Sequence, residues 1–319
     1  MRKVLVIALT TLVVSGCGKT IPTGEMRRNI GFSSLVTRLL IDNTEALREQ
    51  EIKLYGAYHL NGNTVRLFDA ERLYYDALLP GWDYTSTQYW IMGASYNFFA
   101  VCPYATPCTF SYNRDLISIS NYEGSAYGED LVYATASRDL AVNEDYSTVQ
   151  LQFRHACAAL QFNLVNASNS VLTDVRNIYL YGLYNKGTFR FDYNGQSSWL
   201  LEGATLSANA TLQPFAGVCT LPEGGLPVNI DVEHSLYDNG AILVLPQNIY
   251  KSSVTLHIEY KKQGDAEYAV RDIQLGMLGG TTPTEWKAGE KYKYNFNITD
   301  NTITTEVRVV PWIDNYVDL

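Results

Sequence analysis

Alternation of apolar and polar residues is the feature that most restricts how this chain can fold. Residues 149–155 (VQLQFRH), 254–260 (VTLHIEY) and 292–298 (YKYNFNI) place an apolar residue, an aromatic residue or a histidine at every second position. Side chains of a β-strand alternate between two faces, so such segments put one face on a core and the other in water. The sequence therefore predicts half-buried strands at these three places.

Turn signals separate further strand-like runs along the chain. The alternation that begins at Ile52 ends at Asn61-Gly62, a pair typical of hairpin turns, and the run of residues 96–101 ends before Pro103. Many short strands with Gly, Asn and Pro between them favour β-sandwiches. We therefore expect an all-β fold.

The length suits two sandwich-like domains in tandem. Residues 166–172 (NASNSVL) are small and mostly polar and follow a predicted strand, so we place the boundary there. The expected domains are an N-terminal β-sandwich of residues 30–168 and a C-terminal β-sandwich of residues 169–319.

A short apolar run ends at a cysteine near the N-terminus. Two basic residues precede residues 4–14, which are too few to span a bilayer, where about 20 are needed. The sequence VSGC that follows resembles a bacterial lipobox, in which the cysteine is lipidated. We expect residues 1–16 to be a lipoprotein signal peptide, Cys17 to carry the lipid and residues 17–29 to form a tether. The alternative is an ordinary signal peptide with an incidental cysteine.

Charge and aromatic content narrow the classes of partner. The formal net charge is −9, and loss of the signal peptide would make the chain more acidic. Nucleic acid and anionic lipid reward basic patches, so neither is expected as a partner. The 24 tyrosines fit strands that pack on a half-buried sheet. A tyrosine-rich surface that contacts partners is the alternative.

Four cysteines remain once Cys17 is assigned to lipid. Cys102 and Cys108 flank PYATP, whose prolines indicate a tight loop, and an exported chain permits disulfides. A bridge between Cys102 and Cys108 is one interpretation, and two free thiols is the other. We expect Cys157 and Cys219 to pack as small apolar residues. No C-x-x-C pair indicates a metal or redox site.

The sequence contains no recognisable catalytic motif. Its four histidines are far apart, and His155 lies on the apolar side of its strand, which is typical of a core residue. Carboxylates are plentiful, and a glycosidase needs only two of them, but nothing singles out a pair. We therefore expect no enzyme, no metal and no cofactor.

Several stretches taken together resemble the fimbrillin-like proteins of Bacteroidetes, which include the Mfa-like and FimA-like pilins. Each motif is weak alone, and the resemblance rests on their order from residue 30 onward. The motifs are YNFFAVCPYA, DLVYATA, VQLQFRHACAALQFNLVN, LVLPQNI, WKAGEKYKYNFNI and VVPWID. Cys102 and Cys108 depart from the family pattern.

This resemblance implies a surface lipoprotein made of two transthyretin-like β-sandwiches. It would be a structural or adhesive subunit of a fimbria, the type V pilus, anchored to the outer membrane by lipid and joined to other fimbrial subunits. Assembly in the family proceeds by strand exchange: an arginine-specific protease removes the N-terminal strand, and a strand of another subunit fills the vacated groove.

Mapped onto this sequence, the displaced strand would present Ile30, Phe32, Ser34 and Val36 to the core. Cleavage would follow Arg48 or, less favoured, Arg38. The candidate donor strand lies at the C-terminus and uses Ile313, Val317 and Leu319. That segment could instead complete its own sheet.

A second reading is a monomeric surface lipoprotein that binds glycan through exposed aromatic residues. Trp82, Trp90 and Trp199 lie in loop-like contexts where a flat ring could stack on a sugar. A host protein or glycan is the expected ligand in either case. The role as stalk, tip or anchor subunit stays open.

Overall fold

The computed structural model describes residues 28–36, 47–78, 81–123, 130–170, 172–203, 205, 233–235, 241–278 and 282–311. These residues form strands, turns, loops and one short 3-10 helix, η1 (Leu275–Met277), and helical structure is otherwise limited to residues 47–48. This confirms the all-β fold. Within them, no helix has the length and apolar character needed to cross a membrane. The expected signal peptide, Cys17 and most of the tether lie outside the described residues.

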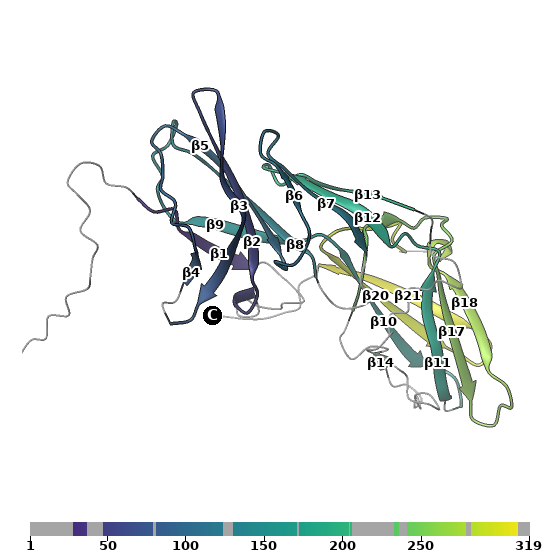
Figure 1. Cartoon of the computed structure of the whole chain (residues 1–319). Helices are drawn as coiled ribbons and strands as arrows, with labels where there is room; N and C mark the ends of the chain where they lie inside the picture. The colour runs from purple at the N-terminus through teal and green to yellow at the C-terminus, as the bar shows by residue number, and fades with distance from the viewer. Residues whose placement is uncertain are drawn as a thin grey trace, which may run out of the picture.

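The N-terminal strands close into a barrel (Figure 1). Around the barrel the order is β1-β4-β3-β2-β5-β8-β9, and β9 returns to pair with β1. Asn61 and Gly62 both have positive φ and form the tight turn between β2 and β3, which confirms the hairpin expected there. The strands are β1 (Phe32–Val36), β2 (Ile52–Leu60), β3 (Asn63–Asp76), β4 (Gly81–Tyr84), β5 (Ser95–Cys102), β8 (Val132–Asp139) and β9 (Val149–His155).

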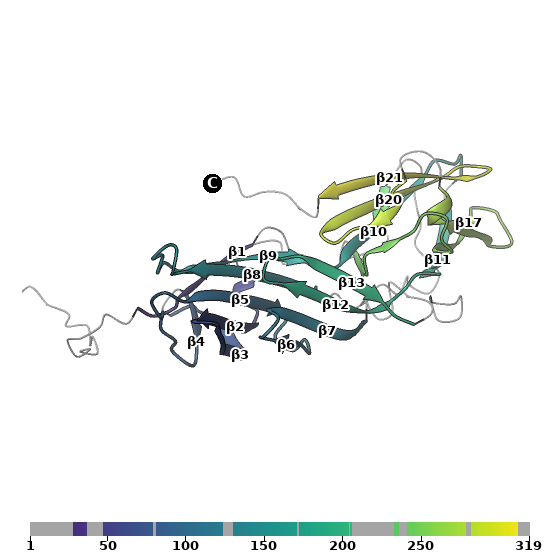
Figure 2. The same ribbon diagram turned by 90° about the horizontal axis from the view of Figure 1, so that it is seen from above.

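Two strands of this barrel, β2 and β5, are covered on both faces. Phe98 of β5 lies in the barrel core, and its neighbour Phe99 lies in a second core on the outer side. Leu54 and Tyr55 of β2 divide in the same way. The covering layer is a four-stranded sheet, seen beside β5 and β8 in Figure 2. It contains β6 (Thr109–Ser111), β7 (Leu116–Glu123), β12 (Lys186–Asp192) and β13 (Ser197–Leu201).

The C-terminal strands build a third core between two sheets. Phe162 of one strand stacks beside Tyr294 and Phe296 of its parallel neighbour, with every second residue of 292–298 buried as the alternation predicts. One sheet has the order β14-β10-β20-β21, with β15 also on β10, and the other has the order β11-β17-β18. Strands β16 and β19 pair separately. The bounds are β10 (Ala158–Asn166), β11 (Leu172–Tyr181), β14 (Glu233–Ser235), β15 (Ile242–Val244), β16 (Gln247–Asn248), β17 (Thr255–Lys262), β18 (Ala269–Gln274), β19 (Glu285–Trp286), β20 (Glu290–Ile298) and β21 (Ile303–Pro311).

The chain passes more than once between the N-terminal strands, which form the barrel and its covering sheet, and the C-terminal strands. Strand β12 pairs with β7, although β12 follows the proposed boundary at residue 168 and β7 precedes it. Phe189 of β12 packs against Tyr133 of the barrel. A division into residues 30–168 and 169–319 therefore leaves strands of one sheet on both sides of the boundary.

A buried histidine and aspartate meet where the barrel adjoins the C-terminal group. Nδ1 of His155 lies 2.6 Å from Oδ2 of Asp130, and both side chains are 3% exposed. Burial raises the pKa of the nearby Cys102 thiol to about 12, and the charge of Asp130 adds to this rise. His155 is thus a core residue with a polar partner, as the alternation indicated.

Replacement of His155 by alanine should lower the free energy of unfolding by about 3–5 kcal/mol, since it leaves the Asp130 carboxylate buried without that partner. Urea denaturation of a soluble chain beginning at residue 18 measures this change. Lys186→Ala is the control, because Lys186 pairs with Glu123 at the surface and such pairs contribute about 0–1 kcal/mol. A similar small change for His155→Ala would contradict the expectation.

Candidate functional site

The N-terminal strand closes the barrel by lying between β4 and β9. It runs parallel to β9 in five consecutive residue pairs, from Phe32↔Val149 to Val36↔Phe153. Its contact with β4 is a single antiparallel pair, Phe32↔Trp82. β1 is therefore held mainly from one side.

Apolar side chains anchor this strand in the barrel core. Ile30 and Phe32 are 1% and 5% exposed. The Phe32 ring lies 5.5 Å from that of Phe98 and 5.8 Å from that of Tyr84, in edge-to-face geometry. The Tyr84 hydroxyl donates a hydrogen bond of 2.7 Å to the carbonyl of Ile30. For Ser34 and Val36 the structure describes the backbone pairing alone.

The residues just before β1 have their own hydrogen-bond partners. Ile30 N–H donates to the Gln88 carbonyl, and Trp90 N–H donates to the Arg28 carbonyl, each over 3.0 Å. The N–H of Val149 then donates to the Gly31 carbonyl over 2.8 Å. Residues 28–31 thus connect the segment that follows β4 with the start of β9, and they bridge the opening between these two strands.

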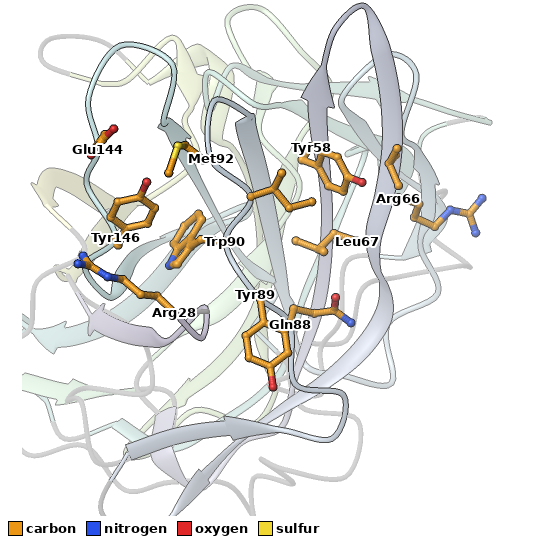
Figure 3. Close-up of a pocket in the computed structure, with 12 residues that line it drawn as sticks. Arg28, Tyr58, Arg66, Leu67, Gln88, Tyr89, Trp90, Met92, Glu144 and Tyr146 are labelled. Carbon is orange, nitrogen blue, oxygen red and sulfur yellow. The ribbon is translucent and has the colours of Figure 1, made fainter. Parts of the chain in front are cut away.

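A cavity of about 930 Å³ lies beside this bridge (Figure 3). Its wall combines aromatic, aliphatic and charged side chains. The aromatic ones come from β2, from the segment between β4 and β5, and from the loop before β9. They are Tyr58, Tyr89, Trp90 and Tyr146. Arg28 also lines the cavity, with its guanidinium 4.7 Å from the centroid of the Tyr146 ring. This size falls within the range of roughly 300–1,000 Å³ that is usual for small-molecule sites.

Trp90 is the residue of the cavity wall with an unmet hydrogen-bond requirement. It is 7% exposed, and its indole N–H has no hydrogen-bond partner within the described chain. Edge-to-face contacts with Tyr96 at 4.8 Å and Phe98 at 6.0 Å fix the ring. Of the three tryptophans of the glycan reading, Trp90 alone lines this cavity. Trp199 instead donates its N–H to the carbonyl of Ala156 over 2.7 Å.

The proposed cleavage residue Arg48 lies on the surface. It is exposed and follows Leu47, which is fully buried, and its guanidinium rests 4.6 Å from the centroid of the Tyr75 ring. β2 begins four residues later, at Ile52. Arg38 lies outside the described residues, as do the donor-strand candidates Ile313, Val317 and Leu319 and the lipidation candidate Cys17.

The two cysteines that flank the PYATP loop are not bridged in the structure. Cys102, Cys108 and Cys157 are free thiols in the structure. Cys102 is buried in the barrel core, while Cys108 directs its thiol to the carbonyl of Thr106 at 3.2 Å. The thiol of Cys157 is fully buried, which raises its pKa, and packs with Leu243 as a small apolar residue would. Cys219 is not among the described residues.

No local pattern in the sequence indicated most of the cavity. Arg28, Tyr58, Trp90 and Tyr146 are widely separated along the chain, and only the closed barrel brings them together. The signals of an aromatic surface were the high tyrosine content and the choice of Trp90 as a residue that could stack on a sugar.

Comparison with known proteins points to one family. A sequence profile of fimbrillin-like proteins matches residues 38–312. A fimbrial protein from Bacteroides vulgatus has a similar structure, with 17% identity, a TM-score of 0.63 and coverage of 89% of this chain and 99% of that one. Among curated proteins, none matches this sequence.

Two further solved structures share the fold. They are candidate cell adhesion proteins from Bacteroides uniformis and Bacteroides ovatus. The first has 15% identity and a TM-score of 0.54, with coverage of 90% of this chain and 99% of that one. The second has 12% identity and a TM-score of 0.53, with coverage of 92% and 100%. At these identities the likeness establishes the fold alone.

Replacement of Phe32 by alanine should loosen β1 from the barrel. Removing a buried phenylalanine costs about 3–5 kcal/mol, and here the loss falls on the strand that closes the barrel. Hydrogen exchange should then accelerate at the amides of Phe32–Val36 and of their partners in β9. Ser33→Ala, at a half-buried position of the same strand, is the control. Unchanged exchange in the Phe32 variant would show that β1 is held by other contacts.

Proposed function

This chain belongs to the fimbrillin-like family, and on that premise we propose that it is a structural or adhesive fimbrial subunit of a type V pilus. Assembly would proceed by donor-strand exchange on the cell surface after proteolysis. The observation that carries this proposal is the position of β1, which fills the gap between β4 and β9 and lies near the N-terminus. The family is fimbrial, which favours a role in assembly over a catalytic one.

Loss of β1 would leave a groove suited to another strand. The backbone groups of Val149–Phe153 that now pair with β1 would be exposed as a sheet edge. Phe68, Tyr84 and Phe98 would form an apolar floor where the Phe32 ring now lies. An incoming strand could satisfy both, since its main chain supplies affinity and its alternate side chains set the register. A head-to-tail contact of this kind does not close and builds a filament.

Proteolysis is needed because an attached strand is hard to displace. A strand tethered through a short linker has an effective concentration in the millimolar range. A strand from another subunit is far more dilute and cannot compete until the tether is cut. Cleavage between residues 36 and 52 converts β1 into a separate peptide that can leave. Arg48 meets this requirement, because it is exposed and lies between the two strands.

The two ends of the chain would complete the mechanism. Lipidated Cys17 would hold the precursor at the outer membrane until cleavage releases it. At the other end, β21 pairs with β20 up to Pro311, and residues 312–319 follow. We propose that this terminal segment, with Ile313, Val317 and Leu319 on one face, is the strand donated to the next subunit.

An arginine-specific protease should shorten the soluble precursor and start its assembly. N-terminal sequencing should find a new terminus at Glu49, and ladders resistant to sodium dodecyl sulfate should follow. Arg48→Lys should block the cut, whereas Arg72→Lys, at another exposed arginine, should not. Cleavage after Arg38 in place of Arg48 would move the site without changing the mechanism. Ladders from uncut protein, or cleaved protein that releases β1 and stays monomeric, would contradict it for a stalk subunit.

Replacement of Cys17 by alanine should abolish incorporation of labelled palmitate in the bacterial host. Each buried CH2 of an acyl chain contributes about 0.8 kcal/mol to membrane binding, so the variant should also leave the membrane fraction. Cys219→Ala is the matched control, since it removes another cysteine and should keep the label. Labelling that survives in the Cys17 variant would exclude this cysteine as the anchor.

A further inference from the structure

We propose that the cavity beside β1 binds a saccharide that carries a carboxylate, and that the N-terminal segment supplies part of the site. The first observation is the buried indole N–H of Trp90, which has no partner within the described chain. An indole is a donor only, and a buried donor without an acceptor is unfavourable. The ring is fixed by Tyr96 and Phe98, so an acceptor that reached the N–H would satisfy it while the ring stayed in place.

A cation lies on the same side of the cavity. In Figure 3 the indole nitrogen of Trp90 is turned toward the side where Arg28 lies. Arg28 contacts the Tyr146 ring and has no ion pair with any carboxylate of the described chain. Arg66 also lines the cavity, but its guanidinium binds Asp69, rests on Tyr112 and points away from the opening. Two donors, one of them charged, thus lie on the same side of the cavity, and a carboxylate has acceptors for both.

The remaining wall suits a sugar ring. Tyr58, Tyr89 and Tyr146 present aromatic surface on which the C–H face of a sugar can stack. Gln88 can both donate and accept hydrogen bonds, and Glu144 can accept them from hydroxyl groups. Val65, Leu67, Ile91 and Met92 add aliphatic surface. Such a wall, with apolar faces and both kinds of hydrogen-bonding group, fits an acidic sugar of the sialic or uronic type.

The site depends on the segment that precedes β1. Arg28 belongs to it, and the backbone bonds of Arg28 and Ile30 to Trp90 and Gln88 hold the cavity wall in place. If β1 leaves after proteolysis, as the proposed function requires, Arg28 leaves with it. The precursor should therefore bind the sugar, and the processed subunit should bind it weakly.

Calorimetric titration of the soluble precursor tests the site with two matched pairs of probes. Sialyllactose is compared with lactose, and digalacturonate with its methyl ester. At least one acidic probe should bind about tenfold or more tightly than its neutral partner, because charged hydrogen bonds contribute about 1.5–3 kcal/mol. Absence of binding by both acidic probes, or equal binding of the neutral ones, would overturn the proposal.

Variants assign the binding to the named groups. Trp90→Phe keeps an aromatic ring but removes the N–H, and Arg28→Gln removes the charge; each should weaken acidic-probe binding at least about tenfold. Trp199→Phe and Arg72→Gln are the controls, since Trp199 donates its N–H elsewhere and Arg72 rests on a different tyrosine, Tyr74. Circular dichroism checks that each variant is folded. Unchanged affinity in either cavity variant would overturn the assignment.

Protease treatment separates this proposal from the proposed function. Cleaved protein that has lost β1 should bind the acidic probe at least about tenfold more weakly, as the Arg28 variant does. Full affinity after loss of β1 would overturn the role of the N-terminal segment. Failure of the protease to release β1 would instead count against strand exchange, and the titrations of the precursor would still decide the sugar site.

Discussion

The pairing of β1 with β9 is the contact on which the rest of the N-terminal half depends. It turns a curved sheet into a closed barrel, because β1 covers the edge of β9 with five residue pairs and reaches β4 through one. The hydrogen bonds of this ladder involve the main chain and carry no sequence information. Register comes from Ile30 and Phe32, which occupy the barrel core. A strand with the same spacing of apolar residues could therefore take the place of β1.

Local patterns in the sequence predict β2, β5, β9, β17 and β20, because burial on one or both faces leaves a direct trace. Residues 292–298 alternate since one face of β20 is buried. The segment YNFFAVC is apolar at nearly every position, because β5 is covered on both faces. Phe98 lies inside the barrel and Phe99 outside it. The run alone does not say what covers the second face, and the layer that does so includes strands from beyond residue 185.

The pairing of strands that are distant along the chain could not be predicted from the sequence. β1 and β9 are separated by more than a hundred residues, and no local signal joins them. The sheet formed by β7 and β12 likewise spans the stretch where small polar residues indicated a boundary. The cavity is a further case, because Arg28, Trp90 and Tyr146 meet only after the barrel closes. Cysteine spacing left a bridge and two free thiols open, and in the structure Cys102 is a free thiol in the barrel core.

One short segment, residues 28–31, contributes both to the cavity and to the closure of the barrel by β1. Residues 28–31 bond to residues 88–90 on one side and to Val149 on the other, so they wall the cavity and lead into the closing strand. Any molecule that binds Arg28 and Trp90 together holds this segment in place and stabilises the closed barrel by mass action. Conversely, departure of β1 removes Arg28 from the wall. Ligand binding and strand departure are therefore thermodynamically linked and must oppose each other, whatever the ligand is.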